Sequence, residues 1–449
     1  MIEFLHKHKK GILSGIFIYA LCLTLFTPEK YNYAFNLLCC ISYIATTIIY
    51  FGCRNKRNYM DFETMFFIAF FFVCFFYPVF IFPVDRTRFW IFEYAFNENL
   101  ISRAAAICYL GAVSYMISYI FAKKTEVKSH FSPRLKTTNL FIISLVSFVI
   151  YIILGGYNAL KNVYINGLRD QGGTYTYFAI IVYICIFCMI SIWFSNSYNK
   201  SKKNFQWDCV PKLQMIYIII YMVLMTFAGN RGTPLKILLQ AIGLYTYLYR
   251  PFSFRKVLSL SVIGSVFMAT IGAYRSGVAQ ISTSVTDLSM DLIISNRSLY
   301  EAINIVDNEG ISFGKSMLAY VIGVIPLLQG FIFNLFGINP DTTTSAMIIT
   351  QSILGTVDET GTGTTIIGDL YLAFGTVGVV VFMWILARFI NYLEATGKNN
   401  IYLLTLYGVM TGVSVYLARA EFFYPARVLL WCVLAIYLSI HFRIDKMFR

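Results

Sequence analysis

Arginines in short polar turns between apolar runs are the residues of this sequence best suited to chemistry. The stretch FAGNRGTPLK (227–236) places Arg231 between two apolar runs of membrane-spanning length. Its neighbours Gly229, Asn230 and Gly232 favour tight turns. The guanidinium of arginine is planar and permanently charged, and it binds phosphate oxygens through paired hydrogen bonds. The turn around Arg231 therefore predicts a site for an anionic, phosphate-bearing ligand.

Three further arginines occupy similar places in the sequence. Arg275 lies in AYRSG at the end of an apolar run, and Arg419 and Arg427 flank the short turn in LARAEFFYPAR. Four like charges at one end of a helical bundle repel one another unless an anion lies among them. We therefore expect these four arginines to surround a lipid pyrophosphate. The alternative for any single boundary arginine is that its side chain extends to lipid headgroups, which is our interpretation of Arg103.

Carboxylates are the candidates for proton transfer. Asp369 lies in the first turn of an apolar run, in TGTTIIGDLYLAFGTVG. A carboxylate there stabilises a helix N-terminus; the alternative is that Asp369 acts as a base or binds a sugar hydroxyl. Glu421 lies between Arg419 and Arg427, so it either pairs with them or takes part in the chemistry. The remaining acidic candidates are Asp287, Asp291, Glu301, Asp341, Asp358 and Glu359.

The composition indicates what kind of fold must position these residues. Of the 449 residues, 58% are hydrophobic and only 13% are charged. The apolar residues form blocks of about 16–22 residues, the length that crosses the core of a bilayer. We predict an all-α polytopic membrane protein with about twelve spans and a single integral membrane domain over residues 1–449. The expected spans are 11–26, 34–52, 64–82, 101–122, 140–155, 177–195, 213–229, 235–249, 257–273, 367–387, 401–418 and 428–442.

The distribution of charge predicts the orientation of these spans. The segments on one side hold 23 of the 36 Lys and Arg but 7 of the 22 Asp and Glu. Loops rich in Lys and Arg stay in the cytoplasm, so we expect both termini inside and the four arginine turns outside. Topology thus accounts for the net charge of +14, and no nucleic acid is needed to explain it. The cytoplasmic segments are 1–10, 53–63, 123–136, 199–212, 250–256, 388–400 and 443–449.

One apolar run, MLAYVIGVIPLLQGFIFNLFG (317–337), is long enough to span but would then place the basic C-terminal segments outside. We therefore predict that it forms two short interfacial or re-entrant helices, broken near Pro326. The result is a large outer loop over residues 274–366. A loop of this length is too long for a simple connection and usually carries function.

The histidines exclude several mechanisms. His6, His8, His130 and His441 all lie in or beside the segments predicted to be cytoplasmic. No histidine is then available outside as a general base, a metal ligand or a member of a catalytic triad. The outer segments also lack the Asp-x-Asp pair or Cys/His spacing typical of a bound divalent ion. We expect outer chemistry to depend on arginines and carboxylates, without a metal or other cofactor.

The order of these motifs resembles that of the Wzy-type O-antigen polymerases, which join oligosaccharide repeat units in bacteria. The matching features are the NRG turn, YRSG, the long loop with FGKSMLAYVIGVIPLLQGF, the acidic residue leading DLYLAFGTVGVVVF, and the arginine-bearing last turn. The resemblance covers the chain from about Asn139 onward. It implies a GT-C-like glycosyltransferase of the bacterial inner membrane that acts on the periplasmic side. Such enzymes transfer a glycan from undecaprenyl pyrophosphate to a hydroxyl of another lipid-linked repeat, independently of metal, and release undecaprenyl pyrophosphate.

The resemblance also implies roles for individual residues. The basic positions carry over to Arg231 and Arg275, and further to Arg419 and Arg427, which would stabilise the leaving pyrophosphate. The acidic position carries over to Asp369; it or a loop acid such as Glu301 would deprotonate or orient the acceptor hydroxyl. The implied partners are undecaprenyl-pyrophosphate-linked glycans and membrane lipid, with a chain-length regulator protein as a further candidate.

Other functions remain open at this stage. The related O-antigen ligases use the same donor, but their pattern includes a histidine in the large outer loop, where this sequence has none. A flippase for lipid-linked oligosaccharides also has about twelve spans, but such transporters usually show two related halves and short loops. An acyltransferase is disfavoured by the same missing histidine. A structural scaffold would not need several outer arginines at membrane depth.

Overall fold

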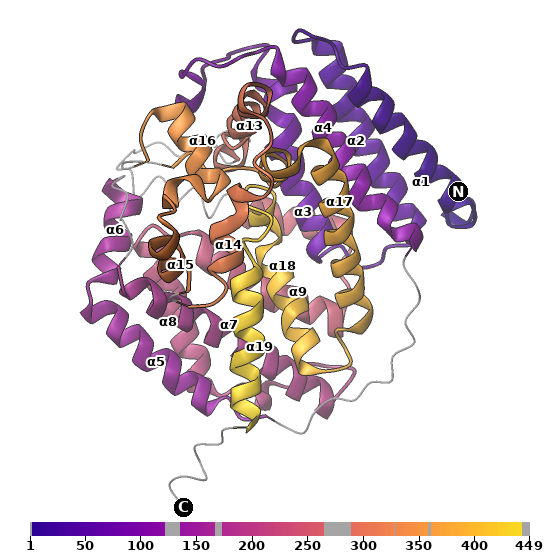
Figure 1. The fold of residues 1–449 in the computed structure, drawn as a ribbon. Coiled ribbons are helices and arrows are strands. Elements are labelled where there is room, and N and C mark those ends of the chain that lie inside the picture. The colour runs from indigo at the N-terminus through magenta and orange to yellow at the C-terminus, as the bar shows by residue number, and fades with distance from the viewer. Residues whose placement is uncertain are drawn as a thin grey trace, which may run out of the picture.

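The computed structural model describes residues 2–121, 135–166, 173–264, 289–326, 328–357 and 361–441. Within these ranges the fold is all-helical, with seventeen α-helices and no β-strand (Figure 1). Five of the described helices are long and apolar enough to cross a membrane, or six if one bent pair counts as a single span. The prediction of an all-α, polytopic membrane protein is therefore confirmed.

The long helices coincide with the predicted runs. They are α1 (Ile2–Leu25), α2 (Tyr33–Cys53), α3 (Phe62–Phe71) continued by the π-helical η1 (Phe72–Ile81), α4 (Leu100–Ile117), α5 (Thr138–Ile153), α7 (Tyr175–Lys200), α8 (Lys212–Phe227), α9 (Gly232–Leu248), α17 (Ile366–Thr396), α18 (Ile401–Leu417) and α19 (Ala426–His441). The run predicted at 257–273 is helical up to residue 264 and then leaves the described residues. Because α5, α8, α9, α18 and α19 have only 16 or 17 residues, the number of twelve spans stays a prediction.

Polar side chains define where several of these helices begin. Asn32 before α2 accepts a hydrogen bond from the backbone of Phe35 at 3.0 Å, and Asn400 before α18 does the same for Leu403 at 2.8 Å. The first backbone N–H groups of a helix have no partner within the helix, so such caps stabilise its start. Caps of this kind explain why the apolar runs begin as helices at these positions.

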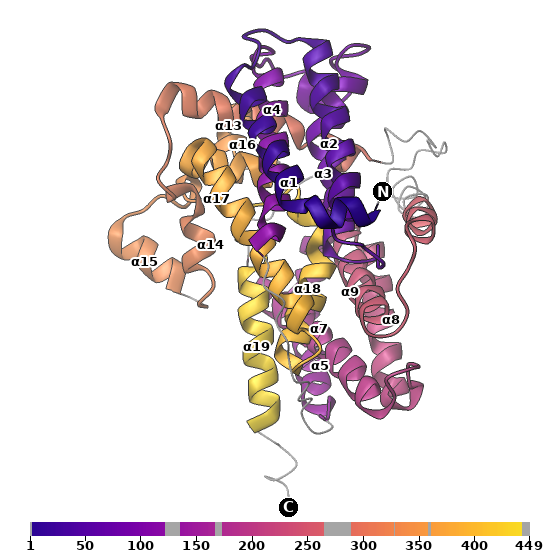
Figure 2. The ribbon, with the colours of Figure 1, turned by 90° about the vertical axis from the view of Figure 1, so that its right-hand side faces the viewer.

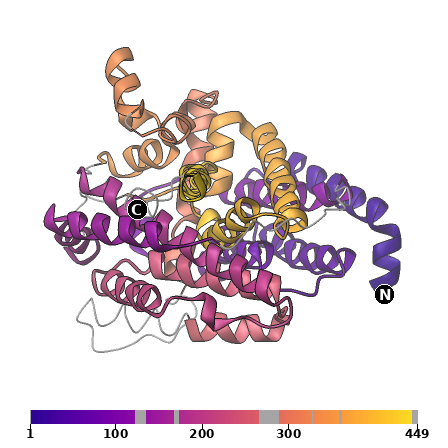
Figure 3. The same cartoon turned by 90° about the horizontal axis from the view of Figure 1, so that it is seen from below.

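The helices form two groups with the C-terminal helices between them. Helices α1–α4 lie on one side and α5–α9 on the other, and α18 lies between the groups (Figures 1 and 3). Helix α17 packs on α4, whereas α18 packs on α3, α7 and α9, and α19 packs on α7, α18 and α5. Helix α18 therefore connects both groups, and α19 extends from it along α7 and α5 of the second group.

The described part of the predicted outer loop is a set of short helices. They are α12 (Met290–Ile293), α13 (Asn296–Glu309), η5 (Lys315–Met317), α14 (Leu318–Ile322), α15 (Leu328–Phe336), η6 (Pro340–Thr342) and α16 (Ser345–Leu354). The run 317–337 is thus broken near Pro326 into two helices too short to span, as predicted. Helices α14 and α15 project from one flank of the bundle (Figure 2).

Irregularities in two long helices anchor this loop. Helix α17 is interrupted at Phe374 and Gly375, and the φ of 63° at Gly375 is one that glycine adopts without strain. Near this break, the backbone N–H of Ser312 in the loop donates a hydrogen bond to the carbonyl of Leu372 at 2.9 Å. The side chain of Asn296 in α13 donates a hydrogen bond to the carbonyl of Val73 in η1 at 2.7 Å. Residues of the loop thereby donate hydrogen bonds to carbonyl groups in the irregular parts of α17 and η1. The remaining described elements are α6 (Gly156–Asn166), bent 69° from α5, and η2 (Trp90–Phe92), η3 (Ser118–Phe121) and η4 (Trp207–Cys209).

Candidate active site

A polar cavity of about 560 Å³ lies where α7, α9 and α19 meet the short helices of the loop. Its charged lining residues are Lys236, Glu421 and Arg427. Aromatic and aliphatic side chains form much of the remaining wall. Pockets that combine apolar walls with a few converging polar groups are typical binding sites for small ligands. The other polar residues of the wall are Tyr151, Thr176, Tyr183, Tyr221, Asn230, Thr233, Tyr320, Gln329, Thr344 and Tyr424.

Lys236 supplies a buried positive charge to this cavity. Its residue is 8% exposed, and its ammonium group donates a hydrogen bond to the hydroxyl of Tyr424. The ammonium nitrogen also lies 4.2 Å from the centre of the Tyr416 ring. At this distance a positive charge is attracted to the face of an aromatic ring. No carboxylate in the described part of the chain forms a salt bridge with it. A buried charge without a counter-charge is costly, so this wall of the cavity favours an anionic ligand.

Arg427 adds a second positive charge to the same cavity. It lies in the first turn of α19, where its Nε donates to the carbonyl of Gly323 at 2.6 Å. This bond fixes the end of α14 against α19. No salt bridge to a described carboxylate neutralises the guanidinium. Lys236 and Arg427 therefore present two uncompensated cations to one cavity, an arrangement suited to phosphate oxygens.

Glu421 is the carboxylate that lines the cavity. It is 6% exposed and lies in the turn between α18 and α19. It forms no salt bridge with Arg419 or Arg427, so the pairing considered from the sequence is not present. Burial raises the pKa of the Glu421 carboxyl above its usual range, although the nearby hydroxyl of Tyr320 and backbone of Ala346 partly oppose this. A carboxylate with a raised pKa accepts a proton more readily near neutral pH.

Asp369 lies directly behind the turn that carries Glu421. It is fully buried, and its Oδ2 accepts a hydrogen bond from the backbone N–H of Phe422 at 2.8 Å. Its other oxygen, Oδ1, has no hydrogen-bond partner within the described ranges. The capping role considered for Asp369 belongs to Thr365, whose Oγ1 accepts from the backbone of Gly368 at 2.9 Å. Asp369 instead positions the residue next to Glu421, but it does not line the cavity.

Arg231 lies at the edge of the cavity rather than in its wall. Its guanidinium forms a salt bridge with Asp291 at 3.2 Å. The cavity is lined by its neighbours Asn230 and Thr233, and the side chain of Asn230 caps the backbone N–H of Thr233 at 3.1 Å. Within the predicted turn, Asn230, Thr233 and Lys236 therefore line the cavity. Arg231 instead forms a salt bridge with Asp291 of the loop.

Gly232 explains why this turn is rich in glycine. A Cβ at this position would lie 2.1 Å from the hydroxyl oxygen of Tyr416, far inside van der Waals contact. Tyr416 is also the ring nearest to the ammonium of Lys236 among its described aromatic neighbours. The close approach of the turn to α18 thus holds the aromatic surroundings of the buried lysine in place.

The other predicted arginines lie elsewhere. Arg419 is partly buried, 6.0 Å from the ring centre of Tyr416, and does not line the cavity. Arg275 lies outside the described residues. Arg103 does not extend away from the protein: it donates to both carboxylate oxygens of Asp307 at 2.7 and 2.9 Å and to the hydroxyl of Tyr371 at 2.5 Å. Arg103 therefore joins α4 to α13 and α17.

Glu301 is held in a hydrogen-bonded network away from the cavity wall. It accepts from Arg297 at 2.9 Å, Ser352 at 2.8 Å and Asn304 at 3.1 Å. Burial raises the pKa of the Glu301 carboxyl, but these hydrogen bonds and the charge of Arg297 lower it more, so the net pKa lies below its usual range. This environment stabilises the ionised form and suits a residue that fixes α13 to α16. The geometry gives no support to the catalytic role predicted for Glu301.

Lys236 is a candidate functional residue that the sequence reasoning missed, together with Tyr320 and Tyr424, which line the same cavity. A signal for Lys236 was present, because it is a lysine that follows Arg231 by five positions and lies inside an apolar run. Ionisable residues within membrane segments usually face the interior of the bundle and mark functional sites. The two tyrosines give no such signal, since this sequence contains 33 tyrosines.

Comparison with known proteins identifies the family. No curated protein and no solved structure matches the chain. A family model described as O-antigen polysaccharide polymerase Wzy matches residues 11–449, which include every helix that contributes to the cavity. The match agrees with the order of motifs in the sequence. The chain therefore belongs to the O-antigen polysaccharide polymerase Wzy family.

Proposed function

We propose that this protein joins oligosaccharide repeat units carried on undecaprenyl pyrophosphate, on the periplasmic face of the bacterial inner membrane. Membership of the family implies polymerisation of lipid-linked repeat units. The observation that carries the assignment of the site is the buried ammonium of Lys236, which lacks a carboxylate partner in the described chain and shares a cavity with Arg427 and Glu421. The pyrophosphate of the donor supplies the missing negative charge.

The two cations stabilise the leaving group. When the bond between the anomeric carbon and the pyrophosphate oxygen breaks, its electron pair stays on the pyrophosphate and adds negative charge there. Lys236 and Arg427 stabilise this negative charge from fixed positions. Such prearranged electrostatic stabilisation is usually a large part of catalysis. Donor binding by Arg231, Arg275 and Arg419 stays a prediction, since Arg231 pairs with Asp291 and Arg419 does not line the cavity.

Glu421 takes the proton of the acceptor. The hydroxyl at the non-reducing end of the second repeat unit attacks the anomeric carbon, its proton passes to the carboxylate of Glu421, and undecaprenyl pyrophosphate leaves. A general base of this kind typically contributes a rate factor of about 10²–10⁴. Asp369 holds the turn in place through Phe422, so that it acts as a positioning residue. Holding both lipid-linked substrates in one site lowers the entropic part of the barrier.

Deletion of the protein, followed by complementation, tests the proposed function. Without it, we expect surface glycan that stops at one repeat unit, together with accumulation of the lipid-linked single repeat on the outer leaflet. The wild-type chain should restore long polymers, and the Glu421→Gln variant should not. Complete loss of surface glycan would instead indicate a ligase, and repeat units trapped on the cytoplasmic leaflet would indicate a flippase.

A further inference from the structure

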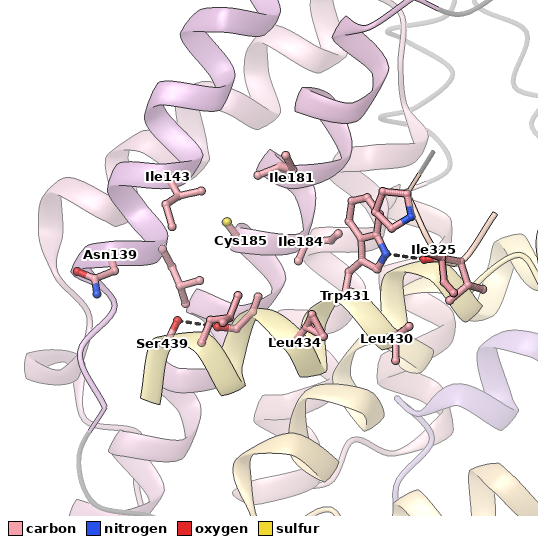
Figure 4. A pocket seen from close by; sticks show the side chains of 15 residues that line it. Asn139, Ile143, Ile181, Ile184, Cys185, Ile325, Leu430, Trp431, Leu434 and Ser439 are labelled. Atoms are coloured by element: carbon pink, nitrogen blue, oxygen red, sulfur yellow. Dashed lines mark hydrogen bonds between the residues drawn. The ribbon is translucent and has the colours of Figure 1, made fainter. Parts of the chain in front are cut away.

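A second, almost wholly apolar groove of about 730 Å³ lies beside the polar cavity. Helices α5, α7 and α19 form it, and the link between α14 and α15 closes one end. Figure 4 shows Ile143 of α5, Ile184 of α7 and Leu434 of α19 facing the same space. The groove contains no charged side chain. Its chemistry is that of a site for a hydrocarbon chain.

The groove continues the polar cavity along the same three helices. On α19, Arg427 lines the cavity, whereas Leu430 and Leu434, further along the helix, line the groove. On α5, Tyr151 lines the cavity and Ile143 lines the groove. On α7, the cavity residues run from Thr176 to Tyr183 and the groove residues from Ile181 to Cys185. The groove therefore lies toward the N-terminus of α5 and toward the C-termini of α7 and α19, and adjoins the cavity on all three helices.

The end of α14 marks the boundary between the two spaces. Arg427 donates to the carbonyl of Gly323 at 2.6 Å. Trp431, one helical turn further along α19 and labelled in Figure 4, donates to the next carbonyl, that of Val324, at 2.7 Å. Two adjacent backbone groups at the break before Pro326 are thus fixed to α19. The same cationic side chain lines the polar space and holds the wall of the apolar space.

We propose that the groove binds the isoprenoid tail of the lipid whose pyrophosphate occupies the polar cavity. This inference rests on the proposed function for the identity of the headgroup. From Arg427 to Leu438 the helix rises about 16 Å at 1.5 Å per residue, so the groove holds the first isoprene units of a long tail. A tail that leaves the pyrophosphate beside Arg427 enters the groove directly, because the two spaces share their helices.

The expected energetic effect of the groove is modest. Lipid tails in a bilayer are as apolar as the groove, so moving an isoprenoid chain between them gains little hydrophobic free energy. The benefit is orientation: a tail held on α19 aligns the pyrophosphate with Lys236 and Arg427. A groove that orients a substrate changes the rate with the correct lipid more than it changes total membrane binding.

Photo-crosslinking tests the site independently of polymerisation. The probe is undecaprenyl pyrophosphate with a diazirine in its first isoprene units and no glycan, added to the full chain in phosphatidylcholine vesicles. We expect crosslinks on α7 near Ile184 and on α19 near Leu434, which excess unlabelled undecaprenyl pyrophosphate removes and excess phosphatidylglycerol does not. Removal by phosphatidylglycerol as well would show that the groove holds ordinary membrane lipid, and would overturn the proposal. Crosslinks confined to other helices would overturn it too.

Two neighbouring isoleucines of α5 provide a matched pair of variants. Ile143 lines the groove and is 44% exposed, whereas Ile142 does not line it and is 48% exposed. Ile143→Trp should reduce groove crosslinking and lower the rate with a long-tailed donor about threefold to tenfold, which corresponds to roughly 0.7–1.4 kcal/mol. It should leave unchanged the rate with a donor whose pyrophosphate carries a methyl group in place of the isoprenoid tail, and Ile142→Trp should leave both rates unchanged.

The outcomes separate this inference from the proposed function. Crosslinks in the groove without any polymerisation by the wild-type chain would support the tail site and contradict the polymerase activity. Polymerisation with equal effects of Ile143→Trp and Ile142→Trp on both donors would support the activity and contradict the tail site. Recovery of both variants in folded form is checked by their thermal unfolding in detergent.

Discussion

The carboxylate of Asp369 accepts a hydrogen bond from the backbone N–H of Phe422 over 2.8 Å. This contact joins the first turn of α17 to the turn between α18 and α19, and the residue before Phe422 is the cavity carboxylate Glu421. Two acidic residues 52 positions apart in the sequence therefore act on one turn. Glu421 lines the cavity and Asp369 fixes the backbone behind it, and we propose that the first acts as the base and the second as a positioning residue.

Substitutions at Asp369 test this division. Asp369→Asn keeps an oxygen that can accept from Phe422, whereas Asp369→Ala leaves that partly buried N–H without its partner. We expect the alanine variant to lose about 1–3 kcal/mol of unfolding free energy, and the asparagine variant to keep most of it and to polymerise within about tenfold of wild type. Thermal unfolding and polymerisation rate are measured on the same preparations. A stable Asp369→Asn variant as inactive as Glu421→Gln would make Asp369 the base.

Glu421→Gln should remove the general base while preserving the shape of the side chain. We expect the rate to fall by at least about 100-fold, with little change in donor affinity, because the two cations are unaffected. The measurement is the initial rate of chain extension by purified protein with a lipid-linked repeat unit. Glu309→Gln, at an exposed position at the end of α13, is the control and should be neutral. Normal polymer from Glu421→Gln would refute the assignment.

Tyr320→Phe should change the pH dependence of the reaction. Burial raises the pKa of the Glu421 carboxyl, and the nearby hydroxyl of Tyr320 lowers it in part. Removing that hydroxyl raises the pKa further. Since the base must be ionised, the acid side of the profile of kcat/KM against pH should move to higher pH. Tyr392→Phe, on the exposed side of α17, should leave the profile unchanged. A shift to lower pH, or none, is incompatible with Glu421 as the base.

Gly232→Ala should disturb the surroundings of Lys236 without removing a functional group. The new methyl group would meet the hydroxyl of Tyr416 and force it away from the ammonium. Overpacking of this kind typically costs about 1–3 kcal/mol of stability, and we expect weaker donor binding as well. Thermal unfolding and KM for the donor report the two effects. Gly330→Ala in α15, where the space around the added methyl is open, is the matched control. Equal behaviour of both variants would contradict the account.

Much of the fold could be predicted from the sequence because apolar runs of membrane length have few alternatives to helix. The break of 317–337 near Pro326 was also predictable, since charge in the later segments opposed a span. The interruption of α17 at Phe374 and Gly375 was not predicted, because it depends on the loop backbone of Ser312, which lies far away in sequence.

The site was predicted only in part. Charge and spacing indicated Asp369, Glu421 and Arg427, but they could not show which of two nearby acids faces the cavity. The glycines beside Arg231 predicted a ligand-binding turn, but Gly232 is needed there because Tyr416 packs too closely for a side chain. The cation in the cavity wall from that segment is Lys236, four residues beyond Gly232 and on the inner face of α9. Which face of a helix points inward depends on the helices that pack against it, and the sequence alone does not identify those helices.

The most direct test of the central claim is the affinity of purified protein for undecaprenyl pyrophosphate with and without Lys236. Lys236→Met keeps the length and apolar stem of the side chain and removes only its charge. We predict that the dissociation constant rises by at least about tenfold, or roughly 1.4 kcal/mol. Lys236→Arg should recover part of the affinity, and Lys212→Met, at the exposed start of α8, should bind like wild type. An unchanged affinity of Lys236→Met, in protein that unfolds at the wild-type temperature, would contradict the assignment of this cavity to the pyrophosphate.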